Sequence, residues 1–285
     1  MNWQVIKIKT LRWLRRIILY GLYSLVISIV LGFAVLQIPT VQESIIARLT
    51  RNFSTVTGFN VTFDSFYLVW YDRLQIEGLK VEDPEKNSMI GIKQLYVNYS
   101  ITSLLKGNDI NVDAVELKGA NVNLITINES DTSRDLNINL FIARINEKYS
   151  SGKGGGGRAP KIKIGEIIID NSSFTYADPK KDSIRTGFDF SHFAVDLNDV
   201  QAQNFRVIGD TIEFNLQSLY GRELQSQFEI KQLQTYFRLS QTSMEFLGIH
   251  AKAGKSIISD TLVFRYQKQT DLNDFVNKVN ITAFL

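Results

Sequence analysis

The chain has 285 residues, a formal net charge of +3 and no cysteine. The lack of cysteine excludes disulfide bonds and thiolate chemistry in any redox compartment. The cations before residue 17 exceed the whole net charge, so the rest of the chain is close to neutral. A near-neutral body argues against nucleic acid as a partner.

The stretch from Ile17 to Leu36 contains no charged residue and no Asn, Gln or Pro. As a helix it spans about 30 Å, which is the thickness of the hydrocarbon core of a bilayer. The cations that precede it are Lys7, Lys9, Arg12, Arg15 and Arg16, and the first cation after it is Arg48. This asymmetry predicts a cytoplasmic basic segment over residues 1–16, a transmembrane helix over residues 17–36 and an ectodomain beyond it.

A cleaved signal peptide and a buried core helix are the alternatives to a permanent anchor. A signal peptide has a shorter apolar region and a small-x-small cleavage site, and the segment Leu36–Thr40 offers no such triplet. A core helix of this length normally keeps a polar stripe, which residues 17–36 lack. We therefore predict an uncleaved, single-pass anchor.

Residues 37–58 have the pattern of an amphipathic juxtamembrane helix. Val41, Ile45, Leu49 and Phe53 recur every four residues, and Gly58 is placed to end the helix.

From residue 59 the apolar residues alternate with polar ones, as in Phe59–Phe63, Phe188–Phe190 and Ile212–Leu216. This period predicts a mainly β ectodomain with an elongated, curved antiparallel sheet that is apolar on one face. A Gly-rich loop over residues 151–160 separates two β-rich segments, 59–150 and 161–285. Short helices are predicted at Ile101–Lys106, Leu140–Tyr149 and Asp271–Asn277. A last strand begins at Val279, and its apolar end predicts that the natural protein continues.

A weak internal repeat joins two β segments at a residue that tolerates positive φ. Its pattern is apolar-x-apolar-x-[Gly/Asn]-x-x-apolar, and its copies run from Leu74 to Val81, Val115 to Val122, Ile167 to Phe174 and, more loosely, Met244 to Ala251. The repeat predicts a kink or bulge that the chain uses several times without leaving the sheet. Ordinary hairpin turns in a β-sandwich are the alternative interpretation.

Residue patterns for catalysis are weak. His192 and His250 have no metal-ligand spacing around them, and the segment Gly248–Ser256 has five residues between its glycines where a phosphate loop has four. We therefore predict no enzyme activity, no metal, no cofactor and no bound nucleotide.

An apolar sheet face must be covered or must hold a ligand. A second layer would give a closed core, whereas an open groove would solvate acyl chains, and the periodicity does not separate the two. If a groove exists, we expect its lining at period-two apolar positions: Phe63, Ile76, Val97, Val112, Val122, Leu124, Ile169, Phe174, Phe190, Val195, Phe214 and Phe264.

The ordered set of segments resembles the N-terminal part of the TamB proteins (translocation and assembly module), especially forms seen in Bacteroidota. These belong with the AsmA-like, chorein-type bridge proteins. The segments that carry the resemblance are Leu36–Gln42, Val61–Phe66, Leu74–Asp83, Ile92–Val97, Ser103–Lys106, Val115–Leu124 and Asp271–Lys278.

The resemblance implies an inner-membrane anchor, a periplasmic ectodomain and a taco-shaped β groove whose interior conducts phospholipids toward the outer membrane. It also implies an alternative, in which the protein is a scaffold that assists the assembly or secretion of outer-membrane β-barrel proteins with a TamA-like partner. The chain lacks the long middle and the C-terminal domain of that family, so it would form only the inner-membrane end of a bridge.

Overall fold

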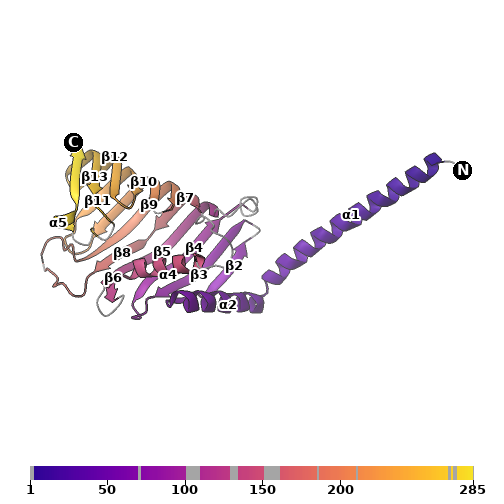
Figure 1. Cartoon of the computed structure of the whole chain (residues 1–285), viewed down its shortest axis with the longest axis horizontal. Coiled ribbons are helices and arrows are strands. Elements are labelled where there is room, and N and C mark those ends of the chain that lie inside the picture. The colour runs from indigo at the N-terminus through magenta and orange to yellow at the C-terminus, as the bar shows by residue number, and fades with distance from the viewer. Residues whose placement is uncertain are drawn as a thin grey trace. The chain divides into compact units, whose positions relative to one another are not determined.

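The computed structural model describes residues 3–69, 72–100, 110–128, 134–150, 161–184, 186–209, 211–268, 271 and 275–284. The chain separates into two compact units, Met1–Ala47 and Arg48–Leu285. The described helices are α1 (Trp3–Leu36), α2 (Pro39–Thr57), α4 (Asn137–Ser150) and α5 (Phe275–Lys278) (Figure 1). The strands are β1 (Asn60–Thr62), β2 (Ser65–Val69), β3 (Arg73–Glu82), β4 (Ser88–Asn98), β5 (Ile110–Asn128), β6 (Arg134–Leu136), β7 (Ile162–Asp170), β8 (Ser172–Ala177), β9 (His192–Ile208), β10 (Thr211–Glu223), β11 (Glu229–Leu239), β12 (Ser243–Ala253), β13 (Ser256–Arg265) and β14 (Asn280–Phe284).

Helix α1 contains the predicted apolar stretch. Its segment Arg16–Leu36 is long and apolar enough to cross a membrane, and its side chains there are largely exposed. The helix begins at Trp3, earlier than expected, because residues 3–16 contain no Gly or Pro that would interrupt it. The direction of insertion and the compartment stay predictions.

Helix α2 confirms the predicted amphipathic helix and its end. Gly58 has a φ of 67°, and its N–H donates to the carbonyl of Ser54 at 2.9 Å. This is the left-handed C-terminal cap for which glycine is suited. The N–H of Val61 donates to the Ser54 hydroxyl at 3.0 Å, which connects the end of α2 to β1.

The described strands form one 14-stranded sheet, mainly in the order β1-β3-β4-β5-β7-β9-β10-β11-β12-β13-β14. Neighbouring strands are antiparallel except where β5 pairs with β7 and β8. That parallel pairing requires a long crossover, which the connection through β6 and α4 supplies. The two predicted β-rich segments therefore share a single sheet.

The predicted kinks are confirmed. Gly78, Gly119, Asn171 and Gly248, the four [Gly/Asn] positions of the repeat, all have positive φ. The flanking pairs Glu77–Gln94 and Leu79–Ile92 put Gly78 at the height of Lys93, and the pairs Gln94–Lys118 and Ile92–Ala120 put Lys93 at the height of Gly119. Further irregularities continue through β9, β10, β11 and β12. We call this succession of bent positions the bulge line; its members with positive φ are Gly78, Gly119, Asn171, Asp199, Gly248 and Asp260.

Helix α4 covers one part of the sheet (Figure 1). Phe59 and Met89 are fully buried there, and Phe141 of α4 meets Phe59 edge to face with ring centroids 5.0 Å apart. The guanidinium of Arg144 donates to the carbonyl of Thr57 at 2.6 Å. These contacts fix α4 against β1 and the end of α2, and they confirm the helix predicted at Leu140–Tyr149.

The strand predicted around Phe188–Phe190 is wrong. Both residues lie in the connection between β8 and β9, because the carboxylate of Asp189 accepts backbone N–H groups and holds a turn instead. Of the helical turn predicted at Asp271–Asn277, the structure describes a 3₁₀ position at Asp271 and helix α5 from Phe275, whereas residues 272–274 lie outside the described residues. The last strand begins at Asn280. The helix predicted at Ile101–Lys106 lies outside the described residues.

Substitution of bulge-line glycines by alanine separates backbone strain from crowding. At Gly248 an added Cβ has nothing within 4 Å, so the loss reflects only its φ of 61°, about 1–2 kcal/mol. At Gly119 the added Cβ also comes 2.7 Å from Cδ of Lys93, so Gly119→Ala should lower the free energy of unfolding further. Urea unfolding of the full chain in detergent, followed by circular dichroism, measures both.

In a Lys93→Ala background the crowding is removed. The free energy of unfolding that Gly119→Ala costs in this background should therefore be close to the cost of Gly248→Ala in the wild type. Equal losses for the two single glycine variants would show that Lys93 does not crowd the bulge.

Candidate functional site

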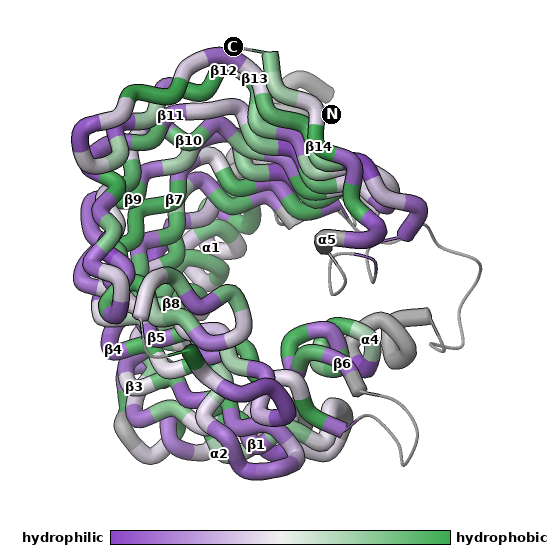
Figure 2. The backbone as a smooth tube through the Cα atoms, turned by 90° about the vertical axis from the view of Figure 1, so that its left-hand side faces the viewer, coloured by the Kyte–Doolittle hydropathy of each residue, from purple (hydrophilic) through white to green (hydrophobic). Residues whose placement is uncertain are grey.

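One face of the sheet collects the apolar side chains. Register pairs connect residues across six neighbouring strands: Leu74, Val97, Val115, Ile167, Ala202 and Leu216. Beyond the bulge line apolar residues again lie opposite one another, since Leu79 pairs with Ile92 and Ile92 with Ala120. We call this side of the sheet the apolar face. Figure 2 shows the alternation of apolar and polar residues along the strands.

Five phenylalanines form a continuous row on the apolar face of β9 to β13. Their ring centroids follow one another at 6.1, 4.9, 5.0 and 6.1 Å. The members of this aromatic row are Phe205, Phe214, Phe237, Phe246 and Phe264. Such cross-strand aromatic contacts stabilise a sheet by about 0.5–1.5 kcal/mol each beyond the area that they bury.

The aromatic row is only half-buried, unlike the part of the sheet under α4. In the described residues, β10 to β13 make substantial contacts only with their neighbours in the sheet. Phe214, Phe237 and Phe246 are all of intermediate exposure, whereas Phe59 and Met89 beneath α4 are 0% exposed. The described part of the chain thus leaves large apolar rings in partial contact with solvent.

The structure brings ten of the twelve predicted lining residues onto the apolar face by register. They are Ile76, Val97, Val112, Val122, Leu124, Ile169, Phe174, Val195, Phe214 and Phe264. The other two lie off the strands: Phe63 follows β1, and Phe190 lies in the β8–β9 connection. Contact of these residues with a ligand stays a prediction.

The opposite face is polar and internally paired. The guanidinium of Arg206 lies 2.9 Å from the Glu213 carboxylate, which also accepts the Tyr236 hydroxyl at 2.6 Å. The hydrogen bond to Glu213 raises the pKa of Tyr236, and burial adds to the effect. A hollow of about 1000 Å³ on the sheet near Gly78 is lined by both acids and lysines, including Asp64, Glu77 and Lys93.

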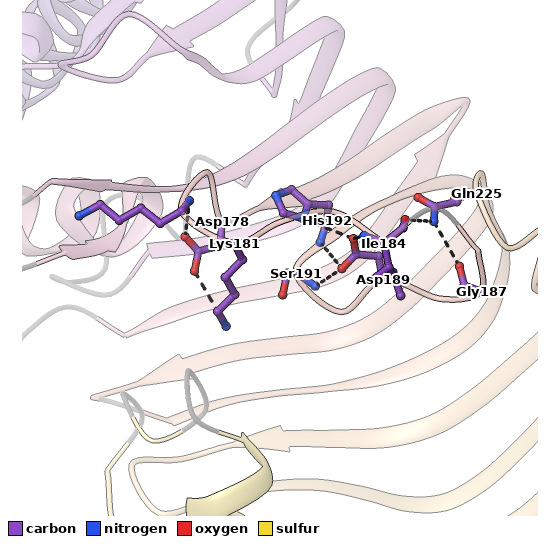
Figure 3. Close-up of polar contacts among 9 residues, drawn as sticks. Asp178, Lys181, Ile184, Gly187, Asp189, Ser191, His192 and Gln225 are labelled. Carbon is purple, nitrogen blue, oxygen red and sulfur yellow. Dashed lines mark hydrogen bonds and ion pairs between the residues drawn. The ribbon is translucent and has the colours of Figure 1, made fainter.

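Buried carboxylates hold the turns at one end of the strands. Asp83, Asp189 and Glu223 are each 3% exposed. Asp189 accepts backbone N–H groups of Ile184 at 2.9 Å, Ser191 at 2.8 Å and His192 at 3.2 Å (Figure 3). These side chains are not among the predicted site residues; the clustering of acids with Ser and Asn in short connections was the available signal in the sequence.

The same contacts lower the pKa of two of these acids. Burial alone would raise the pKa of Asp189, but the three backbone N–H groups and nearby His192 outweigh it and lower that pKa. Burial likewise acts to raise the pKa of Glu223, and donors from Ser226, Gln225 and Ala194 bring it below its usual value.

No protein-family model matches the chain, and no curated protein matches it either.

In the described residues no group of three or more His, Cys, Asp and Glu could hold a metal ion. A small hollow of about 260 Å³ lies beside Tyr176, Phe193 and Leu224, next to the turn that Glu223 holds. The apolar face with its aromatic row is therefore the main candidate site.

The turn carboxylates should make the fold sensitive to acid. The pKa values of Asp189 and Glu223 are lower in the folded chain, so the stabilisation from these two carboxylates is complete above the usual carboxyl pKa of about 4 and is lost as the pH falls through the lower folded value. Asp189→Asn should lower the melting temperature at neutral pH and reduce the further loss between about pH 5 and pH 2. The exposed neighbour Asp182→Asn is the control and should keep the wild-type profile. Identical acid profiles for Asp189→Asn and wild type would contradict the assignment.

Proposed function

We propose that the chain is a membrane-anchored lipid-binding protein whose apolar face holds phospholipid acyl chains. Its role would be phospholipid transport between the inner and outer membranes in outer-membrane biogenesis, as the resemblance to the TamB and AsmA-like bridge proteins implies. The observation that carries the proposal is the half-buried aromatic row, which lies on the apolar face of a sheet and has no second layer over it in the described residues.

The dimensions of the row suit an acyl chain. It crosses five strands, about 19 Å at the usual strand spacing, which exceeds the half-thickness of a hydrocarbon core at about 15 Å. Each CH₂ group that leaves water contributes about 0.8 kcal/mol. Binding of an acyl chain along the row would thus be favoured by the burial of its CH₂ groups. It would also cover phenylalanine rings that are otherwise partly exposed to solvent.

The proposal includes a curved, taco-like groove over the ectodomain. The bulge line supports it, because bulges raise the local twist and bend of each strand. The apolar helix α1 supports an anchor in a membrane. The resemblance implies that this membrane is the inner membrane and that the ectodomain lies in the periplasm. There α2 would lie at the membrane surface near the groove mouth.

Photocrosslinking from adjacent residues on opposite faces tests the proposal. Phe246 belongs to the aromatic row, and Glu245 points to the polar face. With p-benzoylphenylalanine at position 246, the full chain purified from cells should form lipid adducts that mass spectrometry detects. The same probe at position 245 should yield at least several-fold less. The two probes are adjacent in the chain, so lipid bound around α1 is a background common to both, and the comparison isolates the face of the sheet.

The variant Phe246→Arg should reduce the lipid adducts trapped from a probe at position 237, while Glu245→Arg should not. Circular dichroism and melting temperature control for folding. Folded protein with equal or absent adducts at positions 245 and 246 would show that the apolar face holds no lipid.

A second candidate function is strand addition to a client or to a TamA-like barrel partner. In the described residues β14 pairs only with β13, and its sequence Asn280–Phe284 has no charge and no proline to protect its edge. The side chains of Ile281 and Phe284 are more than half exposed. An edge of this kind accepts an extended segment through main-chain hydrogen bonds.

Thr282→Pro should weaken strand addition, because proline removes one backbone donor and disfavours a paired strand. Crosslinks from a cysteine at position 284 to co-purified protein should fall several-fold in this variant, while lipid adducts at position 246 persist. Partner crosslinks that survive Thr282→Pro would argue against pairing through β14.

A further inference from the structure

Large apolar side chains are exposed on the connections at one end of the strands. They lie between β8 and β9, between β10 and β11, and at the start of β13, and their exposed fractions range from 45% to 80%. We call this group the rim; its members are Ile184, Phe190, Leu224, Phe228, Ile257 and Ile258.

The three connections are neighbours in the sheet. Val195 at the start of β9 pairs with Glu223 at the end of β10, and Ile230 at the start of β11 pairs with Ala253 at the end of β12. All three connections therefore lie at the same end of the strands. From β8 to β13 they extend over about 24 Å at the usual strand spacing. A row of exposed apolar side chains of this length is suited to contact a broad surface of a partner and not a narrow pocket.

Hydrogen bonds hold the rim connections in place. The Gln225 side chain donates to the carbonyls of Ile184 at 2.7 Å and Gly187 at 3.4 Å, which joins two connections (Figure 3). The N–H of Gly254 donates to the carbonyl of Glu229 at 3.0 Å and joins the third. The exposed apolar side chains thus stand on fixed turns, and ordering them at an interface requires little backbone entropy.

The exposed charge on these connections is mainly positive. Lys180, Lys181 and Lys255 are exposed, against Asp182 as the exposed acid in the described residues. Asp178 is nearly buried and lies 3.9 Å from the ammonium group of Lys181. Asp189 and Glu223 are turned inward to bind backbone N–H groups, so they present little charge at the tips.

We propose that the rim docks on a bilayer surface that contains anionic phospholipid headgroups. Apolar tips would enter the interface and the lysines would contact the headgroups, a combination that binds membranes through buried apolar area and electrostatic attraction. Helix α1 makes a bilayer the partner that the observations favour, because a chain anchored by α1 keeps the rim at high effective concentration near lipid. The rim is a second membrane contact, separate from both α1 and the aromatic row.

The lack of native cysteine allows a direct test on the full chain. Single cysteines replace Phe228 and Ile257 on the rim, and Thr242 in the β11–β12 connection at the opposite end of the strands is the control. Each is labelled with an environment-sensitive fluorophore, with one chain per nanodisc, in discs of phosphatidylcholine containing about one-third phosphatidylglycerol. Lipids that carry a spin label quench a fluorophore only at short range, so quenching reports that the labelled residue contacts the bilayer of the disc.

The rim probes should shift to the blue and be quenched at least twofold more than the probe at position 242. Quenching should decrease in discs without phosphatidylglycerol and in the variant Lys180→Gln/Lys181→Gln/Lys255→Gln. Melting temperatures equal to that of the wild type establish folding.

Equal quenching at rim and control positions would overturn the proposal. The same probes are also measured in vesicles that hold several chains. A blue shift without lipid quenching that appears in these vesicles but not in discs with one chain would assign the rim to contact between copies of the chain instead. Quenching that is independent of phosphatidylglycerol and of the three lysines would overturn the role of anionic headgroups.

Discussion

The parity of side chains along a bent strand is the constraint on which this structure depends. Successive residues of a strand point to opposite faces, so a one-residue slip moves every following side chain to the other face. At Gly78 and Gly119 one residue adopts a left-handed conformation while the pairing register on either side stays unbroken, and the apolar positions change from Ile76 to Leu79 and from Leu117 to Ala120. This change of parity at the left-handed residue keeps the apolar face continuous across the bend.

The continuous face leaves apolar surface that the described elements cover only in part. Under α4 the sheet has an ordinary core, with Phe59 and Met89 fully buried. Along β9 to β13 the same face presents the aromatic row without such a helix in the described residues. On the other face polar side chains pair with one another, such as Arg206 with Glu213, and that face is compatible with solvent. The two faces therefore differ in polarity: one is suited to apolar ligands and the other to water.

Local features could be predicted from the sequence, and long-range ones could not. The kinks at Gly78, Gly119, Asn171 and Gly248 were recognisable because a short pattern places a residue tolerant of positive φ between apolar pairs. The α2 cap at Gly58 was recognisable for the same reason. The strand expected at Phe188–Phe190 failed because alternation alone does not show that Asp189 binds backbone donors. The parallel β5–β7 pair and the aromatic row depend on which strands are neighbours, which a single sequence does not state.

The bulge line also affects how such a sheet can change in length. Since several strands carry a bend of their own at a corresponding height, a duplicated hairpin with the same bend would fit beside an existing one and leave the other pairings as they are. Interactions between elements here are largely with nearest neighbours, as in repeat proteins, where units can be gained or lost without a new core. The reach of the apolar face is therefore a property that evolution can adjust in steps of about 10 Å per hairpin.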